Sequence, residues 1–217
     1  MLRKSTAVLS MILGVTLFAR VCYGDTIAVA RGSGGYENDA WNGGGTIGWQ
    51  FTLSSPVTVT ELGFFDATGS GGLFDSHPVG IWNSSGTLLG FATVPSGTVG
   101  TLFDRFRFVS VTPFTLGAGT YTIGAYGDQA SLDEFQFGLS GSTTLPALTL
   151  GNAVENQSDP NTLTFPTTVE GFATQGYFGP DFIVATTTPE PSTFSLFAMA
   201  FGLARFFKTV RRKPSTL

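Results

Sequence analysis

The sequence predicts an all-β domain, an antiparallel β-sandwich, preceded by an N-terminal signal helix and followed by a C-terminal apolar helix. Two observations carry the β prediction. Short segments rich in Val, Ile, Phe, Tyr and Thr recur at the intervals of a sandwich, separated by clusters of Gly, Ser, Asn and Pro. No window between these segments shows a sustained helical period. The chain therefore divides into a signal peptide over residues 1–24, a β domain over 25–187 and a tail over 188–217.

The signal segment comes first. Arg3 and Lys4 precede an apolar run over residues 7–19, and the small residue Gly24 follows where cleavage can occur. A lipoprotein interpretation would use Cys22 as the lipidated residue. The residues before Cys22 are not the small ones that a lipobox requires, so an ordinary signal peptide is the preferred interpretation.

Ten strands are expected in the β domain. They cover residues 26–30, 46–53, 57–66, 79–83, 88–94, 103–111, 120–126, 135–139, 162–165 and 181–185. The alternation of side chains changes parity within the third of these strands, which predicts a β-bulge near Glu61. Residues 145–174 are polar and poorly patterned, and apart from the short strand within them they are expected to form long surface loops.

Two pairs of side chains in these strands have an expected environment. Trp49 and Trp82 lie inside strands, so they are expected in the core rather than on a sugar-stacking platform. Arg105 and Arg107 fall on one face of a strand, where we expect them to meet acidic side chains across the sheet.

The tail combines a turn motif, an apolar segment and a basic end. Two prolines in the motif favour extended or turn backbone. The apolar run over residues 194–204 is shorter than the roughly 20 residues that span a bilayer, so we expect a short transmembrane helix followed by a cytoplasmic stop. The motif is Pro189, Glu190, Pro191, Ser192 and Thr193. The membrane stop is Arg205, Lys208, Arg211, Arg212 and Lys213.

Together the two chain ends resemble the PEP-CTERM class of exported bacterial proteins. The resemblance implies that an exosortase, a membrane-embedded cysteine transpeptidase, recognises the tail and cuts near the motif. It also implies a Gram-negative host, transient residence in the inner membrane through the tail helix, and delivery to the cell surface or to an extracellular biofilm matrix of exopolysaccharide. The alternative is a plain C-terminal membrane anchor with an incidental pair of prolines.

A second resemblance covers residues 48–185. It rests on Gly-Trp-Gln-Phe-Thr at 48–52, His-Pro-Val-Gly-Ile-Trp at 77–82 and Leu-Gly-Ala-Gly-Thr-Tyr-Thr-Ile-Gly at 116–124. These segments resemble the jelly-roll-like domains of unknown function that often precede PEP-CTERM tails. The resemblance implies a jelly-roll-like sandwich, and it says more about fold than about activity.

The β domain is strongly acidic. It keeps three arginines and no lysine against 14 acids, a formal charge of −11 that the charge of −4 for the whole chain hides. Such a charge argues against nucleic acid, anionic membrane surfaces and anionic polymers as direct partners unless divalent cations bridge them. Removal of the signal peptide also removes the single cysteine, which excludes a thiol nucleophile, a disulfide and a Cys-ligated zinc site.

Catalysis has little support in the sequence. His77 is the only histidine, so any serine triad would have to use it, and no Gly-x-Ser-x-Gly elbow is present. Fourteen acids offer many carboxylate pairs for a glycosidase, but none stands out. We therefore predict that the protein is not an enzyme, and a secreted hydrolase is the weakest alternative.

Calcium is the ligand that the sequence suggests most directly. Asp66 and Asp75 bracket an acidic, Gly-rich loop whose carboxylates and carbonyls would suit calcium. Trp41 is the best candidate for an exposed aromatic residue that stacks on a sugar. A calcium-dependent carbohydrate-binding module is thus the main alternative. The preferred interpretation is a solvated turn without a cofactor, in an exported, non-catalytic protein of the cell surface or matrix.

Overall fold

The structure is a computed structural model of the 217-residue chain. It describes residues 23–31, 37–40, 44–137, 141–157, 162–171 and 176–187. One compact unit runs from Tyr23 to Thr186. The predicted signal helix, the sorting tail with its apolar helix, and Trp41 lie outside the described residues.

Within the described residues the chain forms β-strands and no helix. The strands are β1 (Tyr23–Ile27), β2 (Val29–Ala30), β3 (Glu37–Ala40), β4 (Gly45–Leu53), β5 (Val57–Phe65), β6 (His77–Asn83), β7 (Leu88–Val94), β8 (Thr101–Phe103), β9 (Phe106–Leu116), β10 (Gly119–Gly127), β11 (Glu134–Phe137), β12 (Thr143–Thr144), β13 (Leu148–Asn156), β14 (Thr168–Val169), β15 (Tyr177–Phe178) and β16 (Pro180–Thr187).

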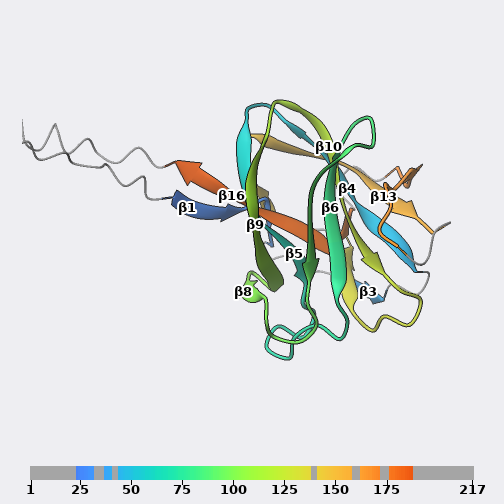
Figure 1. Ribbon diagram of the computed structural model, residues 1–217. Helices are drawn as coiled ribbons and strands as arrows, with labels where there is room; N and C mark the ends of the chain where they lie inside the picture. Colours follow the sequence, from blue (N-terminus) through green and yellow to red (C-terminus); the bar gives the residue numbers. More distant parts are fainter. Residues whose placement is uncertain are drawn as a thin grey trace, which may run out of the picture. The chain divides into compact units, whose positions relative to one another are not determined.

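Two large sheets make up most of the domain (Figure 1). One has the order β1-β16-β5-β9-β8, and the other has the order β14-β13-β4-β10-β6-β7. Two small sheets, β15-β11-β3 and β12-β2, complete the fold. Neighbouring strands such as β4 and β10, β5 and β9, and β6 and β7 pair antiparallel, so the all-β, antiparallel prediction is confirmed. The first strand, β1, and the last strand, β16, are neighbours in one sheet.

The main core is rich in aromatic side chains from both large sheets. Trp49 of β4 is fully buried and stacks on Phe182 of β16, with 6.1 Å between the ring centroids. Its indole Nε1 donates a hydrogen bond to the Pro180 carbonyl over 2.9 Å, so the one polar atom of the side chain is satisfied. Burial of such a ring contributes about 3 kcal/mol. Trp82 is also buried, and the prediction that both tryptophans lie in the core is confirmed.

The predicted bulge in the third strand is present. Both neighbours of β5, the strands β9 and β16, pair with Val59 and then with Glu61, and they skip the residue between. The extra residue shifts the alternation, so Leu62 and Phe64 after the bulge join the same core as Val59 before it.

One predicted strand, over residues 103–111, is broken in two. Asp104 and Arg105 have φ values of 47° and 70° and form the two-residue turn of the hairpin between β8 and β9. Such turns usually carry Asn-Gly or Asp-Gly, so Phe-Asp-Arg-Phe carries no turn signal and its pattern predicts a continuous strand. The expectation that Arg105 lies on a strand face beside Arg107 is therefore wrong.

The region predicted as long loops contains a nine-residue strand. β13 pairs with β4 in the six-stranded sheet, from Leu148 opposite Leu53 to Asn156 opposite Thr46. The strand predicted over 162–165 is absent, since residues 163–167 are irregular. In this segment Thr164 donates its backbone N–H to the Thr46 side-chain hydroxyl over 3.0 Å.

Candidate functional site

Backbone hydrogen bonds and two buried side-chain pairs hold the loop between β5 and β6, residues 66–76, and we call it the braced loop. It leaves β5 at Asp66 and enters β6 before His77. In its middle, Leu73 exchanges two backbone hydrogen bonds with Gly97, of 3.1 and 2.7 Å. Gly72 has a φ of 85°, and a Cβ there would lie 2.5 Å from the Gly97 backbone, so this contact requires glycine.

A buried ion pair holds the first half of the braced loop. Arg107 of β9 donates from Nε to Asp66 Oδ2 over 2.8 Å. Its two remaining guanidinium nitrogens donate to the Gly69 carbonyl over 2.7 Å and to the Gly100 carbonyl over 3.2 Å. The expectation that Arg107 meets an acid across the sheet is confirmed. Arg105 contributes mainly through its backbone, because its carbonyl accepts from the Asp66 N–H over 2.7 Å.

The electrostatics of Asp66 follow from these contacts. Burial alone would raise the pKa of Asp66, but hydrogen bonds from Thr68, Arg107 and Gly69, together with the charge of Arg107, outweigh it and lower the pKa below its ordinary value. Oδ1 accepts from the Thr68 hydroxyl over 2.6 Å and from the Gly69 N–H over 2.8 Å. The positive charge beside the Asp66 carboxylate is thus the Arg107 guanidinium, whereas the calcium hypothesis expects a metal ion beside this carboxylate.

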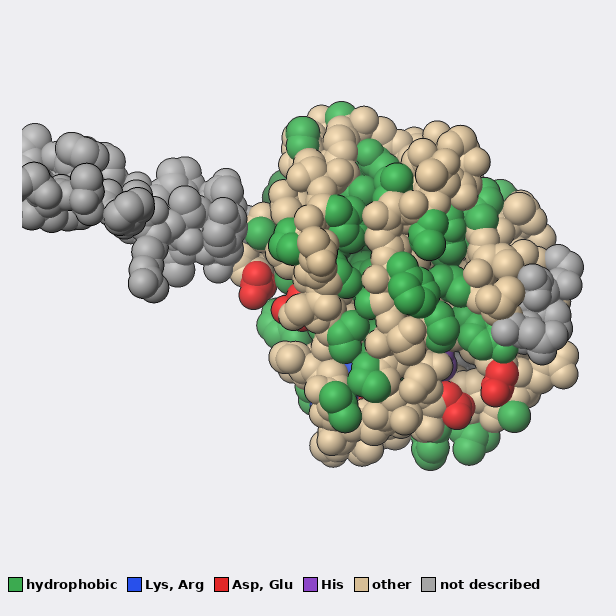
Figure 2. Space-filling model, in the orientation of Figure 1, with side chains coloured by type: hydrophobic (Ala, Val, Ile, Leu, Met, Phe, Trp, Pro, Cys, Tyr) green, Lys and Arg blue, Asp and Glu red, His purple; other side chains and the backbone are tan. Residues whose placement is uncertain are grey.

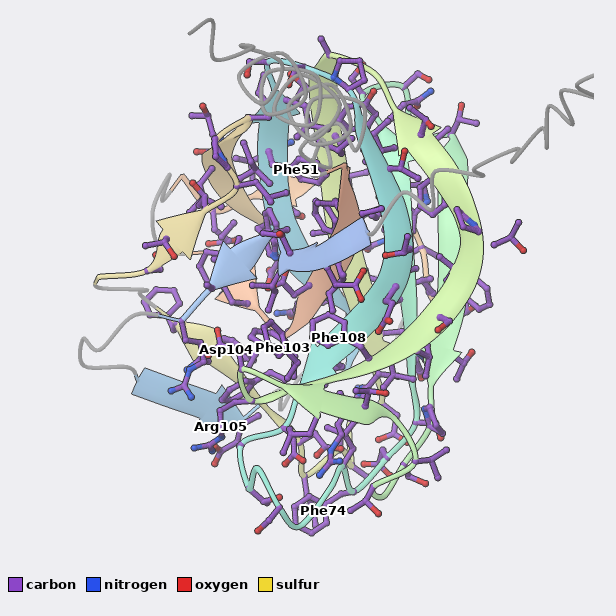
Figure 3. The ribbon with its side chains drawn as sticks, turned by 90° about the vertical axis from the view of Figure 1, so that its left-hand side faces the viewer. Phe51, Phe74, Phe103, Asp104, Arg105 and Phe108 are labelled. Atoms are coloured by element: carbon purple, nitrogen blue, oxygen red, sulfur yellow. The ribbon has the colours of Figure 1, made fainter. Side chains whose placement is uncertain are left out.

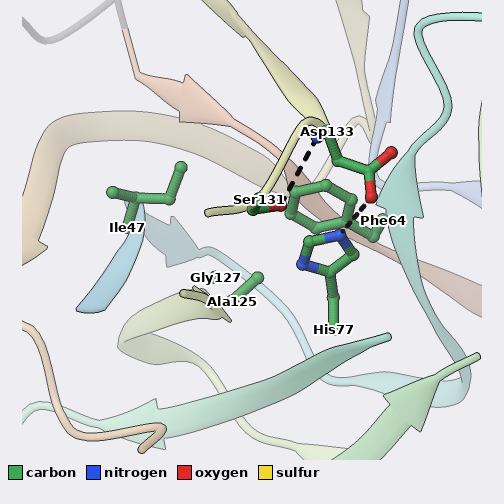
Figure 4. Close-up of a pocket in the computed structure, with 7 residues that line it drawn as sticks. All are labelled: Ile47, Phe64, His77, Ala125, Gly127, Ser131 and Asp133. Atoms are coloured by element: carbon green, nitrogen blue, oxygen red, sulfur yellow. Dashed lines mark hydrogen bonds and ion pairs between the residues drawn. The ribbon is translucent and has the colours of Figure 1, made fainter. Parts of the chain in front are cut away.

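A second buried pair holds the other half of the braced loop. Asp133 accepts hydrogen bonds from the backbone N–H groups of Phe74 and Asp75, over 3.0 and 2.8 Å. Its Oδ2 also lies 3.0 Å from Nε2 of His77, the first residue of β6 (Figure 4). Asp133 therefore ties the segment before β11 to the end of the braced loop.

The His77 ring is fully engaged. Nδ1 lies 3.0 Å from the Tyr126 carbonyl of β10, which can only accept, so Nδ1 carries a proton. Nε2 faces the Asp133 carboxylate, with 3.0 Å between Nε2 and Oδ2. The ring stacks on Phe64 with 3.7 Å between centroids. Both partners, the Tyr126 carbonyl and the Asp133 carboxylate, come from segments that are distant in the sequence.

This geometry bears on the serine-triad question. Ser131, His77 and Asp133 line one cavity with Phe64 and Ile47 (Figure 4). The cavity holds about 10 Å³, which is room for one water at most. With Nδ1 and Nε2 directed at the Tyr126 carbonyl and the Asp133 carboxylate, the imidazole has no nitrogen available to accept a serine proton.

At its tip the braced loop exposes one aromatic ring. Figure 3 shows Phe74 pointing away from the body of the domain, and its side chain is 57% exposed. Leu132, 67% exposed, lines the same shallow depression of about 190 Å³ together with Glu134. A loop fixed by two buried pairs thus presents an apolar contact surface next to an acidic side chain.

A third buried acid lies away from the braced loop. Asp181 of β16 is buried, and its Oδ1 accepts the Phe182 N–H over 2.7 Å. Its Oδ2 is buried without a hydrogen-bond partner within the described part of the chain. Burial raises the pKa of Asp181 well above its ordinary value, the backbone hydrogen bonds from Phe182 and Val29 oppose this shift, and the charge of Asp104 adds to it.

The predicted ligand residues have separate roles in this geometry. Asp66 is paired with Arg107, whereas Asp75 contributes its backbone N–H to Asp133. No group of three or more His, Cys, Asp or Glu side chains in the described ranges is arranged to hold a metal ion. Calcium binding by Asp66 and Asp75 stays a prediction, as does sugar stacking by Trp41. Sequence reasoning missed Asp133 as the partner of His77.

Comparisons of the chain with family models, with curated proteins and with solved structures gave no significant match. In the part of the chain that the structure describes, no helix has the length and apolar character needed to cross a bilayer.

The contacts of Asp133 make a testable prediction for the braced loop. Replacing Asp133 by Ala removes the acceptor of two loop amides and the partner of a buried histidine, so we expect a loss of about 1–3 kcal/mol in the free energy of unfolding. Amide hydrogen exchange at Phe74 and Asp75 should accelerate beyond this global change. The control is Asp128→Ala, because Asp128 lies in the same connection between β10 and β11 but is exposed. Equal exchange rates at Phe74 and Asp75 in both variants would contradict the role of Asp133 in holding the braced loop.

Proposed function

We propose that this chain is an exported, non-catalytic protein of the cell surface or extracellular polysaccharide matrix, processed by an exosortase-type transpeptidase. In this proposal the finer architecture is a jelly-roll-like sandwich that presents its loops to the matrix. The observation that carries the proposal is the order of features at the chain ends: a signal segment at the start, then at the end Pro189-Glu190-Pro191, an apolar run and a basic cluster.

The geometry of the domain supports a presenting role rather than a catalytic one. The single histidine has both ring nitrogens engaged and lies beside a cavity too small for a substrate. The two buried pairs around the braced loop, Arg107 with Asp66 and His77 with Asp133, fix backbone instead of facing an open cleft. What they hold in place is the exposed surface of Phe74 and Leu132, which in this proposal would be the contact for a matrix partner.

The position of the chain ends is consistent with a tethered domain. β1 and β16 are neighbours in one sheet, and in Figure 1 β1 begins and β16 ends at the same side of the domain.

The motif itself provides the test. Replacing Pro189, Glu190 and Pro191 by Ala should block processing in a host with an active exosortase, so the protein should accumulate in the membrane fraction with its tail still attached. Fractionation followed by electrophoresis would show a longer, membrane-bound species in place of a shorter one.

The matched control lies in the same tail. Replacing Pro214, Ser215 and Thr216 by Ala also changes three residues and removes a proline, but outside the motif, and it should leave processing unchanged. Normal processing of the motif variant, or wild-type protein that is never shortened in such a host, would overturn the proposed function.

A further inference from the structure

Edge strands in the described sheets differ in how they are protected against pairing with another chain. β8 has three residues, and β2, β12, β14 and β15 have two each. β1 and β3 are longer, but they carry the acids Asp25, Glu37 and Asp39 in their sequences. Short length and charge are the usual means by which natural proteins prevent edge-to-edge association.

β7 lacks every one of these protections. It is the last strand of the six-stranded sheet, it has seven residues, and its sequence Leu-Leu-Gly-Phe-Ala-Thr-Val contains no charge and no proline. Leu88, Leu89 and Phe91 are exposed on it. Such a strand leaves a full row of backbone donors and acceptors unpaired beside exposed apolar side chains.

No other strand of the described domain is hydrogen-bonded to this edge, although β9 lies beside it with the Phe114 ring against Gly90. A groove of about 550 Å³ separates β7 from β9, lined on one side by Leu89 and Phe91 and on the other by Val111 and Phe114. β9 continues as an edge beyond the short β8, but Pro113 interrupts its row of backbone donors. Within the described sheets, β7 therefore offers a long edge without charge or proline.

The charge distribution indicates which partner fits. Between Asp75 and Asp104 the sequence has no acidic or basic residue, and His77 in that interval is buried. In Figure 2 the hydrophobic and uncharged side chains cover the middle of the face that carries β7 and β9, while acidic side chains lie toward its margins. For a domain with a charge of −11, this neutral edge is a place where two copies can approach with little repulsion.

We propose that two copies of this chain associate through antiparallel pairing of β7 with β7, which joins their six-stranded sheets across a two-fold axis. An antiparallel strand pair is self-complementary, so the same seven residues supply both sides of the interface. The inference is independent of tail processing, because it depends only on the edge of the domain.

The test is sedimentation velocity of the full chain in a neutral detergent over a roughly hundredfold range of concentration, at low and high salt. We expect a monomer–dimer equilibrium that tightens at high salt, because screening weakens repulsion between the acidic domains while the neutral edge is unaffected. Leu89→Lys should weaken dimerisation about tenfold or more, since it places like charges on facing edges.

The matched control is Val99→Lys, which makes the same change at an exposed residue outside β7 and should alter the dimerisation constant less than about twofold. Circular dichroism checks that both variants fold. A wild-type chain that stays monomeric at every concentration and salt, or equal effects of the two lysines, would overturn the proposal.

Discussion

Replacement of Arg107 by Leu is expected to destabilise the domain by about 3–5 kcal/mol, because it leaves the buried Asp66 carboxylate without its counter-charge. It also removes the donors to the Gly69 and Gly100 carbonyls, so the first half of the braced loop loses its support. Chemical denaturation at neutral pH measures this loss. The same substitution at Arg105, which donates one hydrogen bond from its side chain to the Asp66 carbonyl, should cost less than about 1 kcal/mol.

The double variant Asp66→Asn, Arg107→Leu separates the ion pair from the loss of packing. Since Asn needs no counter-charge, the double variant should be more stable than Arg107→Leu alone. Equal stability of the two variants would mean that the pair does not stabilise the braced loop through its charge.

Stability of the wild-type domain is expected to fall as the pH rises above the ordinary pKa of an aspartic acid, through the contribution of Asp181. Because the folded-state pKa of Asp181 is raised, the folded chain holds this proton to a higher pH than the unfolded chain does. The contribution is fully present below the unfolded pKa, at about pH 4, and is lost through the folded pKa with a slope of up to about 1.4 kcal/mol per pH unit.

The variant Asp181→Asn removes this titration and keeps an oxygen to accept the Phe182 N–H. It should match the wild type near pH 3 and become progressively more stable than the wild type at higher pH.

The variant Asp66→Asn should show the opposite pH dependence of its stability difference from the wild type. The pKa of Asp66 is lowered, so its contribution is present above the unfolded pKa and is lost as the pH falls through the folded one. Thermal unfolding of all three chains between pH 3 and pH 8 checks both signs, and parallel curves would contradict them.

Strands with a clear alternation could be predicted from the sequence. β10 carries Tyr121, Ile123 and Ala125 at every second position, and Ile123 and Ala125 are fully buried. The parity change in β5 was equally visible, because hydrophobic residues on both sides of Thr60 needed the same core.

β13 could not be predicted from the sequence, because its residues do not alternate clearly between hydrophobic and polar. β13 carries Gly151 and Asn152 in its middle, and its register against β4 shifts between Leu150 and Ala153. The irregularity breaks the alternation, so the strand is stabilised by its pairing with β4 rather than marked by its own pattern.

Of the two buried pairs that hold the braced loop, only the pair of Arg107 with an acid could be predicted from the sequence. Arg107 and Asp66 lie at neighbouring ends of paired strands, so a strand pattern was enough to expect an ion pair. His77 and Asp133 are 56 residues apart and come from a strand entrance and a connection before β11. Their contact depends on how the two sheets close around Phe64, which no local pattern encodes.

The central claim, an exported protein released from its tail at the Pro-Glu-Pro motif, is tested most directly by the intact mass of the protein recovered from the surface and medium of its own host. We expect a chain that has lost the signal peptide and ends near residues 189–192, with a covalent addition at the new end. A mass that retains residues 205–217 would contradict the claim, because the tail would then be an ordinary membrane anchor.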